Sequence, residues 1–115
     1  MKNNEFFNNM RNAIKNKEAT YGEQAAFWAW RKGIEENQDF PIETDAFWEK
    51  DFLVFLKTIE AAGFKKLGFS GSSTLAMSNL VAFVKKGWRT TGTFKYNISN
   101  IDGYRFSEGL ILEKD

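Results

Sequence analysis

The sequence predicts an α+β fold in which N-terminal helices and a strand-helix-strand-strand unit form a small mixed three-stranded sheet, covered by helices on one face. Two observations predict this class. Apolar residues recur at helical spacing through much of residues 1–62, whereas from Trp88 they alternate with polar residues in the period of a strand. The 115 residues, 43% of them apolar, suit a single domain spanning 1–115.

Three helices are expected in residues 1–62. Residues 2–17 have apolar side chains at helical spacing. A second helix begins after Thr20, because Glu23 three residues later completes a capping box. The strongest helix follows Pro41, since a proline disfavours helix in the residue before it.

This third helix is expected to begin at a cap formed by Thr44 or Asp45 and to end at Gly63 in a left-handed conformation. Its apolar residues recur at intervals of three and four, which predicts a stripe that faces the core. The stripe consists of Trp48, Phe52, Phe55, Leu56 and Ile59. The nearby acidic side chains are expected in solvent, and a magnesium site at Asp45 and Glu49 is the alternative considered for them.

Residues 63–87 read as a strand, a Gly/Ser turn and a helix. The strand spans Phe64 to Ser70, Ser72 or Ser73 caps the helix, and Gly87 ends it after two lysines that suit a helix C-terminus. The residues expected on the buried face of this helix are Leu75, Met77, Leu80, Val81 and Val84.

A hairpin is expected from Trp88 onward. Residues 88–98 alternate between apolar and polar, residues 99–103 contain the Asp-Gly pair of a turn, and residues 104–112 alternate again. Because a helix connects the 64–70 strand to the 88–98 strand, these two are expected to be parallel. One aromatic face of the sheet would then meet the helices, and one polar face would lie outward.

Charge is unevenly distributed. Residues 18–62 carry −6 and are mainly helical, while residues 63–107 carry +6, so a net charge of only +1 hides an acidic and a basic region. The chain has no cysteine and no histidine, which excludes thiolate nucleophiles, imidazole bases and zinc sites that need either residue. We therefore expect a protein that is not an enzyme and has no cofactor and no metal.

The polar face of the hairpin is the predicted partner-binding surface, because it combines basic and hydroxyl side chains. An exposed ring, either Trp28 or Trp30, is expected to add an aromatic anchor. The predicted residues are Arg89, Thr91, Thr93, Lys95, Asn97, Arg105, Lys85, Lys86, Trp28 and Trp30. An ordinary solvated sheet face is the alternative.

The segment SGSST is a second candidate site, because hydroxyls and free N–H groups at a helix N-terminus suit an anion. Its residues are Ser70, Gly71, Ser72, Ser73 and Thr74. It matches neither the P-loop pattern nor GxGxxG, and ordinary helix capping explains the same residues.

The layout AGFKKLGFSGSSTLAMSNLVAFVKKGW, followed by a glycine-containing strand, resembles small uncharacterised proteins of phages and mobile elements of Gram-positive bacteria. Such proteins include inhibitors of host defence systems, anti-CRISPR proteins among them. The resemblance covers roughly residues 52 to 112, is one of pattern, and brings no catalytic residues. It implies a non-enzymatic inhibitor that docks on a host nuclease or another protein or ribonucleoprotein complex.

Two other functions remain open: nucleic-acid binding by the basic sheet face, and a small ligand-binding domain or enzyme that uses the SGSST turn. No apolar run approaches the length of a membrane span, and the first residues lack the apolar centre of a signal peptide. We therefore expect a cytoplasmic protein of a bacterial host cell with no membrane partner.

Overall fold

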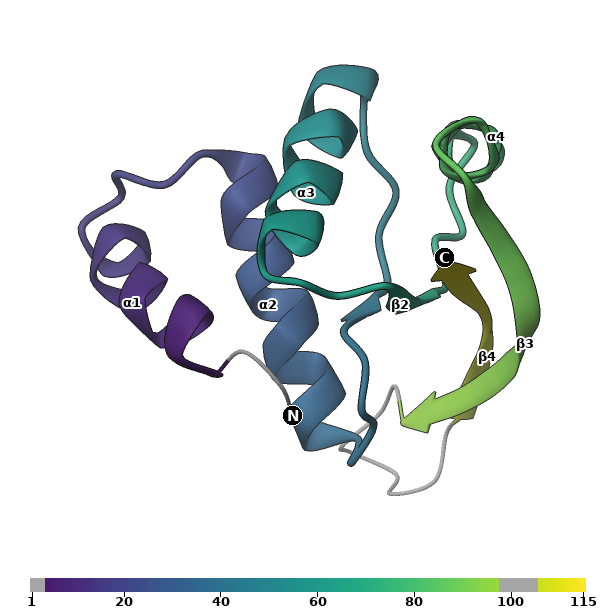
Figure 1. Cartoon of the computed structure of the whole chain (residues 1–115), viewed down its shortest axis with the longest axis horizontal. Coiled ribbons are helices and arrows are strands. Elements are labelled where there is room, and N and C mark those ends of the chain that lie inside the picture. Colours follow the sequence, from purple (N-terminus) through teal and green to yellow (C-terminus); the bar gives the residue numbers. More distant parts are fainter. Residues whose placement is uncertain (1–3, 98–105) are drawn as a thin grey trace.

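The computed structural model describes residues 4–97 and 106–115, which form four helices and a four-stranded sheet (Figure 1). The α+β class is confirmed, but the expected count of three strands is wrong by one. In chain order the elements are α1 (Asn4–Lys15), α2 (Tyr21–Glu35), β1 (Ile42–Glu43), α3 (Glu49–Ala61), β2 (Lys66–Phe69), α4 (Leu75–Lys85), β3 (Trp88–Asn97) and β4 (Phe106–Lys114). Within the described residues, no helix is both long and apolar enough to cross a membrane.

The sheet has the strand order β1-β2-β4-β3. The additional strand, β1, pairs in parallel with β2, with Ile42 opposite Gly68. The hairpin pairing of β3 with β4 is antiparallel, as expected, and β4 also pairs antiparallel with β2. It follows that β2 and β3 run parallel, as the helical connection predicts, but β4 lies between them. The expected turn at 99–103 lies outside the described residues.

A β-bulge at Thr91 divides β3 into two parts. Thr90 lies opposite Leu112 and Gly92 lies opposite Ile111, so one residue of β3 has no counterpart in β4. An extra residue reverses the alternation of side chains between the two faces of a sheet. Trp88 therefore points to one face and Phe94 to the other.

The main core lies on the face of the sheet that the helices cover. All four helices contribute to it, and Figure 1 shows α1, α2 and α3 side by side next to the sheet. Many of its contacts are between aromatic rings, as in the stacked pair of Phe47 and Phe55 at 4.9 Å between centroids. Its strand residues are Leu67, Phe69, Trp88 and Leu112.

The opposite face of the sheet is not the polar surface that the alternation predicts. It carries a second buried cluster, with Phe94 packed edge-on against Phe40 at 5.6 Å. Two glycines make room for the Phe94 ring, because a Cβ on Gly68 or Gly109 would lie 2.6 or 2.7 Å from it. The cluster consists of Phe40, Ile42, Phe94 and Tyr96, with Ile111 packed against it.

Helix ends follow the local sequence in most places. The capping box of Thr20 and Glu23 is present, and Gly63 and Gly87 have φ values of 87° and 92°. The predicted cap of α3 is wrong, because the helix begins at Glu49 and residues 42–43 form β1 instead. Trp48 precedes the first turn of α3 and is 69% exposed, so it does not belong to the core stripe.

The predicted buried face of α4 is also wrong. The buried residues of this helix are Asn79 and Phe83, whereas Met77, Val81 and Val84 are exposed. Asn79 determines this orientation, because its side chain accepts a hydrogen bond from the backbone N–H of Phe47 at 2.7 Å and donates one to the Phe47 carbonyl at 2.9 Å. A buried amide that satisfies two backbone groups holds α4 in one rotation about its axis.

Candidate functional site

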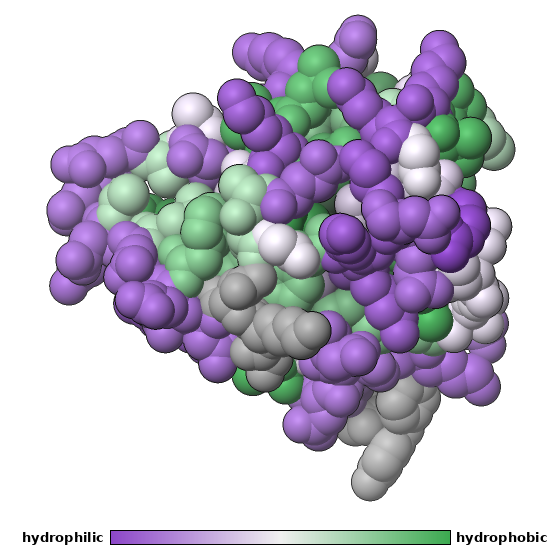
Figure 2. All heavy atoms as spheres, in the orientation of Figure 1, coloured by the Kyte–Doolittle hydropathy of each residue, from purple (hydrophilic) through white to green (hydrophobic). Residues whose placement is uncertain are grey.

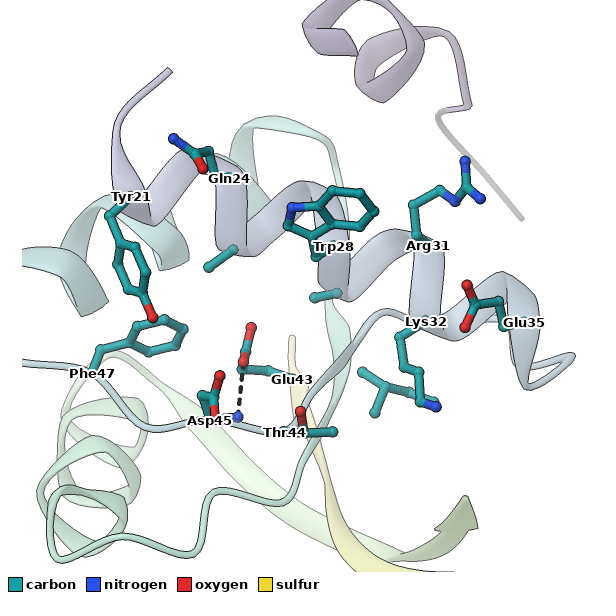
Figure 3. Close-up of a pocket in the computed structure, with 13 residues that line it drawn as sticks. Tyr21, Gln24, Trp28, Arg31, Lys32, Glu35, Glu43, Thr44, Asp45 and Phe47 are labelled. Carbon is teal, nitrogen blue, oxygen red and sulfur yellow. Dashed lines mark hydrogen bonds between the residues drawn. The ribbon is translucent and has the colours of Figure 1, made fainter. Parts of the chain in front are cut away.

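A cleft of about 460 Å³ lies between α2 on one side and β1 with the segment that follows it on the other (Figure 3). This volume suits a small molecule or a single side chain of a partner. The rings of Tyr21, Trp28 and Phe47 line it together with several polar side chains. Those polar side chains are Gln24, Arg31, Lys32, Glu35, Glu43, Thr44 and Asp45.

Glu43 is the most unusual residue of the cleft, because it is a carboxylic acid and the whole residue is only 6% exposed. The strand β1 places it under α2, since Ile42 occupies the opposite face of the sheet. The Asp45 backbone N–H donates to Oε1 of Glu43 at 2.9 Å. Burial raises the pKa of Glu43 to about 8, despite the lowering effect of the backbone N–H groups of Asp45 and Thr44.

The carboxylates also affect the neighbouring phenol. The pKa of Tyr21 is raised, first by burial and then by the negative charges of Asp45, Glu43 and Asp51. Figure 3 shows Tyr21, Glu43 and Asp45 facing the same part of the cleft, while Arg31, Lys32 and Glu35 lie toward its other end. The cleft therefore has an acidic, aromatic half and a half that contains both basic residues.

The electrostatic character of the cleft favours a positively charged ligand in its acidic half. Perturbed carboxyl groups inside a concave site are a common feature of binding and catalytic sites. Among residues 4–97 and 106–115, no three acidic side chains gather into a group that could hold a metal ion. The magnesium site considered for Asp45 and Glu49 therefore has no third acidic ligand in the described residues.

A second concave surface lies between α3 and α4. It is a groove of about 570 Å³, and its apolar lining includes Trp48, Phe52, Leu53 and Val81. Val84 and Met77 extend this apolar surface along α4 and are 62% and 67% exposed. Figure 2 shows hydrophobic side chains at the surface over α4, at the upper right. We call this surface the α3–α4 groove, and it consists of Trp48, Leu53, Met77, Val81 and Val84.

The two predicted tryptophan anchors differ in position. Trp28 is 57% exposed and lines the cleft, so it is accessible to a ligand or partner. The candidate Trp30 is wrong as a surface residue, because it is 3% exposed and its ring stacks on Phe7 at 5.2 Å. Its Nε1 atom is a buried polar atom without a hydrogen-bond partner within the described residues.

The predicted basic face is divided by the bulge. Arg89 lies opposite Glu113, whereas Lys95 lies opposite Glu108, and these positions of β4 point to opposite faces of the sheet. The shared face expected for Arg89, Thr93 and Lys95 is therefore wrong. Thr91 lies in the bulge, and Arg105 lies outside the described residues.

Acidic neighbours also reduce the positive charge of this strand. Arg89 pairs with Asp115 at 2.7 Å and Lys95 with Glu108 at 3.7 Å. The backbone N–H of Asn97 donates to Oε1 of Glu36, the C-cap residue of α2, at 3.0 Å. Lys85 and Lys86 are exposed at the end of α4 and line the α3–α4 groove.

The SGSST segment has structural contacts at both ends. Ser70 donates to the Glu108 carbonyl at 3.2 Å and accepts from the Tyr96 hydroxyl at 2.9 Å. Ser73 Oγ accepts from the Leu75 N–H at 3.2 Å, but the N-cap of α4 is Thr74, which forms no side-chain cap hydrogen bond, so the predicted caps Ser72 and Ser73 are wrong. A Cβ on Gly71 would meet the Phe69 ring at 2.8 Å, which explains the glycine. Ser72 and Thr74 are exposed.

Sequence reasoning missed Glu43 and the outward face of α4. The signal for Glu43 was a carboxylate directly after the apolar run Phe40–Ile42. For α4 it was Asn79, a polar residue in a helix whose other positions are mostly apolar. Neither signal identifies a buried polar residue until the positions of the neighbouring helices and strands are known.

Comparison with known families identifies the domain. The model of a family described as a domain of unknown function, DUF7698, matches residues 25–107, which is well over half of the chain. The chain therefore belongs to the DUF7698 family. No curated protein and no solved structure matches it.

Proposed function

We propose that this member of the DUF7698 family is a non-enzymatic binding module that takes an amphipathic helix of a partner protein in the α3–α4 groove. The observation that carries the proposal is the outward apolar face of α4, where Met77 and Val84 are more than 60% exposed. Large apolar side chains that gather on the surface around a groove are typical of interaction sites. Burying one such side chain stabilises a complex by about 1.5–3 kcal/mol before the costs of association.

The lining of the groove supports a helical partner. Apolar side chains from both α3 and α4 line it. A third helix with apolar residues at intervals of three and four fits such a groove. Asn79 fixes the rotation of α4 through Phe47, so the apolar face is held outward before binding.

Charges at the two ends of the groove indicate the chemistry of the partner. Three lysines lie near the C-terminal end of α4: Lys57, Lys85 and Lys86. The nearby Glu60 already forms an ion pair with Lys114 at 3.3 Å. Glu49 lies near the start of α3. A partner helix with carboxylates over the lysines therefore has complementary charge.

A second copy of this chain fits less well than an acidic partner. An antiparallel pair would place three lysines of one copy, Lys57, Lys85 and Lys86, against the single Glu49 of the other. The partner expected from the resemblance is a host protein or ribonucleoprotein complex, and the inhibitor role stays a prediction. The division of the basic sheet residues, two of which are paired with acids, favours this groove over a nucleic-acid surface on the sheet.

Designed helical peptides test the proposal. Two labelled peptides share an apolar stripe and differ in whether glutamates or lysines flank it, and fluorescence anisotropy measures their affinity. We expect the glutamate peptide to bind at least about tenfold tighter. Val84→Asp should abolish binding, and Lys85→Glu/Lys86→Glu should reverse the preference. Ser72→Asp adds a charge at an exposed site that does not line the groove and serves as the matched control.

Three results would contradict the proposal. Equal affinity for both peptides would show that the lysines do not select the partner. Retained binding by Val84→Asp would place the contact elsewhere. A concentration-dependent dimer in analytical ultracentrifugation that Val84→Asp converts to a monomer would assign the groove to a second copy of the chain.

A further inference from the structure

The Glu43 cleft contains a carboxyl group that the proposed protein-binding role does not use. Glu43 is 6% exposed, and within the described residues it forms no ion pair with a lysine or arginine. A buried carboxylate without a cation is costly, because the backbone N–H groups compensate only part of the lost hydration. Such a group is retained at a cost in stability, and a positively charged ligand would offset that cost.

The carboxyl group is aimed at the open part of the cleft. Oε1 of Glu43 accepts the Asp45 N–H, and Figure 3 shows the carboxyl group directed away from the backbone, toward the ring of Trp28. The Asp45 side chain points into the same space. Two carboxylates therefore reach the cleft, one from the last residue of β1 and one from the segment directly after it.

Aromatic rings line the remaining walls of this half. Tyr21 and Phe47 meet edge-on at 6.1 Å on one side, and the exposed ring of Trp28 lies on α2 above the carboxyl groups. Aromatic faces attract cations, and carboxylates accept strong hydrogen bonds from them. The combination of rings and carboxylates is selective for an organic cation over a neutral molecule of the same shape.

We propose that the cleft binds a primary ammonium group, with Glu43 and Asp45 accepting its hydrogen bonds and with Tyr21 and Trp28 contacting the carbons next to it. The ammonium belongs either to a small free amine or to a lysine side chain of a peptide. Both sources present the same –CH₂–NH₃⁺ group.

The other half of the cleft restricts what else the ligand carries. Arg31 and Lys32 lie toward this end. Lys32 is held by Glu36 at 3.3 Å and donates to the Asn97 carbonyl at 3.1 Å, so its position is fixed by the protein. Like charges repel inside a partly enclosed site. Because Lys32 is paired with Glu36, the repulsion comes from Arg31, which forms no ion pair within the described residues. A second ammonium beside Arg31 is disfavoured, and the ligand is a monoamine with a neutral or anionic tail.

NMR titration of the ¹⁵N-labelled protein tests the site, with the Trp28 indole N–H and the Asp45 amide as reporters. The probes are n-butylammonium, the diamine cadaverine, the tripeptide acetyl-Gly-Lys-Gly-amide and neutral n-butanol. The titrations use about pH 8.5, which lies above the raised pKa of Glu43 and below that of an alkylammonium.

We expect saturable shifts with n-butylammonium or the lysine peptide, and the tighter of the two identifies the source. Cadaverine should bind more weakly than n-butylammonium. Glu43→Gln, which keeps the shape and an acceptor oxygen, should weaken binding at least about tenfold, whereas Glu35→Gln at the other end should change it less than about twofold.

Several outcomes would overturn the site. Binding of n-butanol as tight as that of n-butylammonium would leave no role for charge. Unchanged affinity in Glu43→Gln would exclude this carboxyl as the acceptor. The proposal would be rejected if neither n-butylammonium nor the lysine peptide shifts the resonance of either reporter. The variant Val84→Asp alters the α3–α4 groove and leaves the cleft intact, so it should bind the amines as the wild type does.

Discussion

Replacing Glu43 by glutamine removes a buried ionisable group and keeps a side chain of nearly the same size. The glutamine oxygen can still accept the Asp45 N–H that Glu43 accepts at 2.9 Å. The substitution therefore isolates the cost of ionisation from the cost of lost packing. Because burial raises the pKa of Glu43 from 4.5 to about 8, the folded protein holds a proton that the unfolded chain releases.

The sign of the effect follows from this difference in bound protons. Below the unfolded pKa of 4.5 both states are protonated and the full stability is present, and it is lost as pH rises toward the folded pKa of about 8. Each pH unit in this window costs about 1.4 kcal/mol, so at pH 7 the wild type loses about 3 kcal/mol that the glutamine variant keeps. Glu43→Gln should therefore be more stable than the wild type at neutral pH.

Urea unfolding followed by tryptophan fluorescence at pH 4.5, 6, 7 and 8 measures the effect. Subtracting the wild-type free energy of unfolding from that of the variant removes the contribution of all other titrating groups. This difference should grow from near zero at the lowest pH to several kcal/mol at about pH 8. Glu35→Gln, which changes an exposed carboxylate of the same cleft, should show no such growth. A difference that stays constant with pH would refute the burial argument for Glu43.

Three further predictions follow from single contacts. Gly109→Ala should destabilise the fold by about 1–3 kcal/mol in urea unfolding, because the added Cβ would lie 2.7 Å from the Phe94 ring and 2.9 Å from the Phe69 carbonyl. Gly92→Ala is the control and should be tolerated, because its Cβ would lie 3.8 Å from Ile111. Asn79→Ala leaves two buried backbone groups of Phe47 unpaired and should cost about 2–4 kcal/mol by calorimetry; a loss below about 1 kcal/mol would show that water replaces the side chain. Thr20→Ala removes the capping box with Glu23 and should cost about 1 kcal/mol, and an unchanged midpoint would mean that packing alone holds the start of α2.

Several local features of the fold follow from a few adjacent residues and were predicted correctly. The capping box at Thr20 and the left-handed glycines at 63 and 87 depend on backbone and side-chain chemistry within one turn. The pairing of β3 with β4 follows from two alternating segments close in sequence. The expected turn between them lies outside the described residues.

The candidate sites depend on contacts between distant segments. The bulge at Thr91 separates Arg89 from Lys95, and two-residue alternation cannot show an extra residue in a strand of ten. α4 is apolar on most of its surface, so periodicity selects no face, and the choice comes from Asn79 meeting Phe47 32 residues away. The inhibitor role, the identity of the partner and the functional roles of the candidate site residues stay predictions.

By itself, the sequence determined the α+β class, most helix ends and the hairpin, because each depends on local propensity and spacing. The tertiary structure decided which side chains are accessible. β1 exists because β2 offers an edge to pair with, and that pairing buries Glu43 beneath α2. Burial is a property of packed elements and not of a residue, so both the cleft and the α3–α4 groove became visible only in the folded chain.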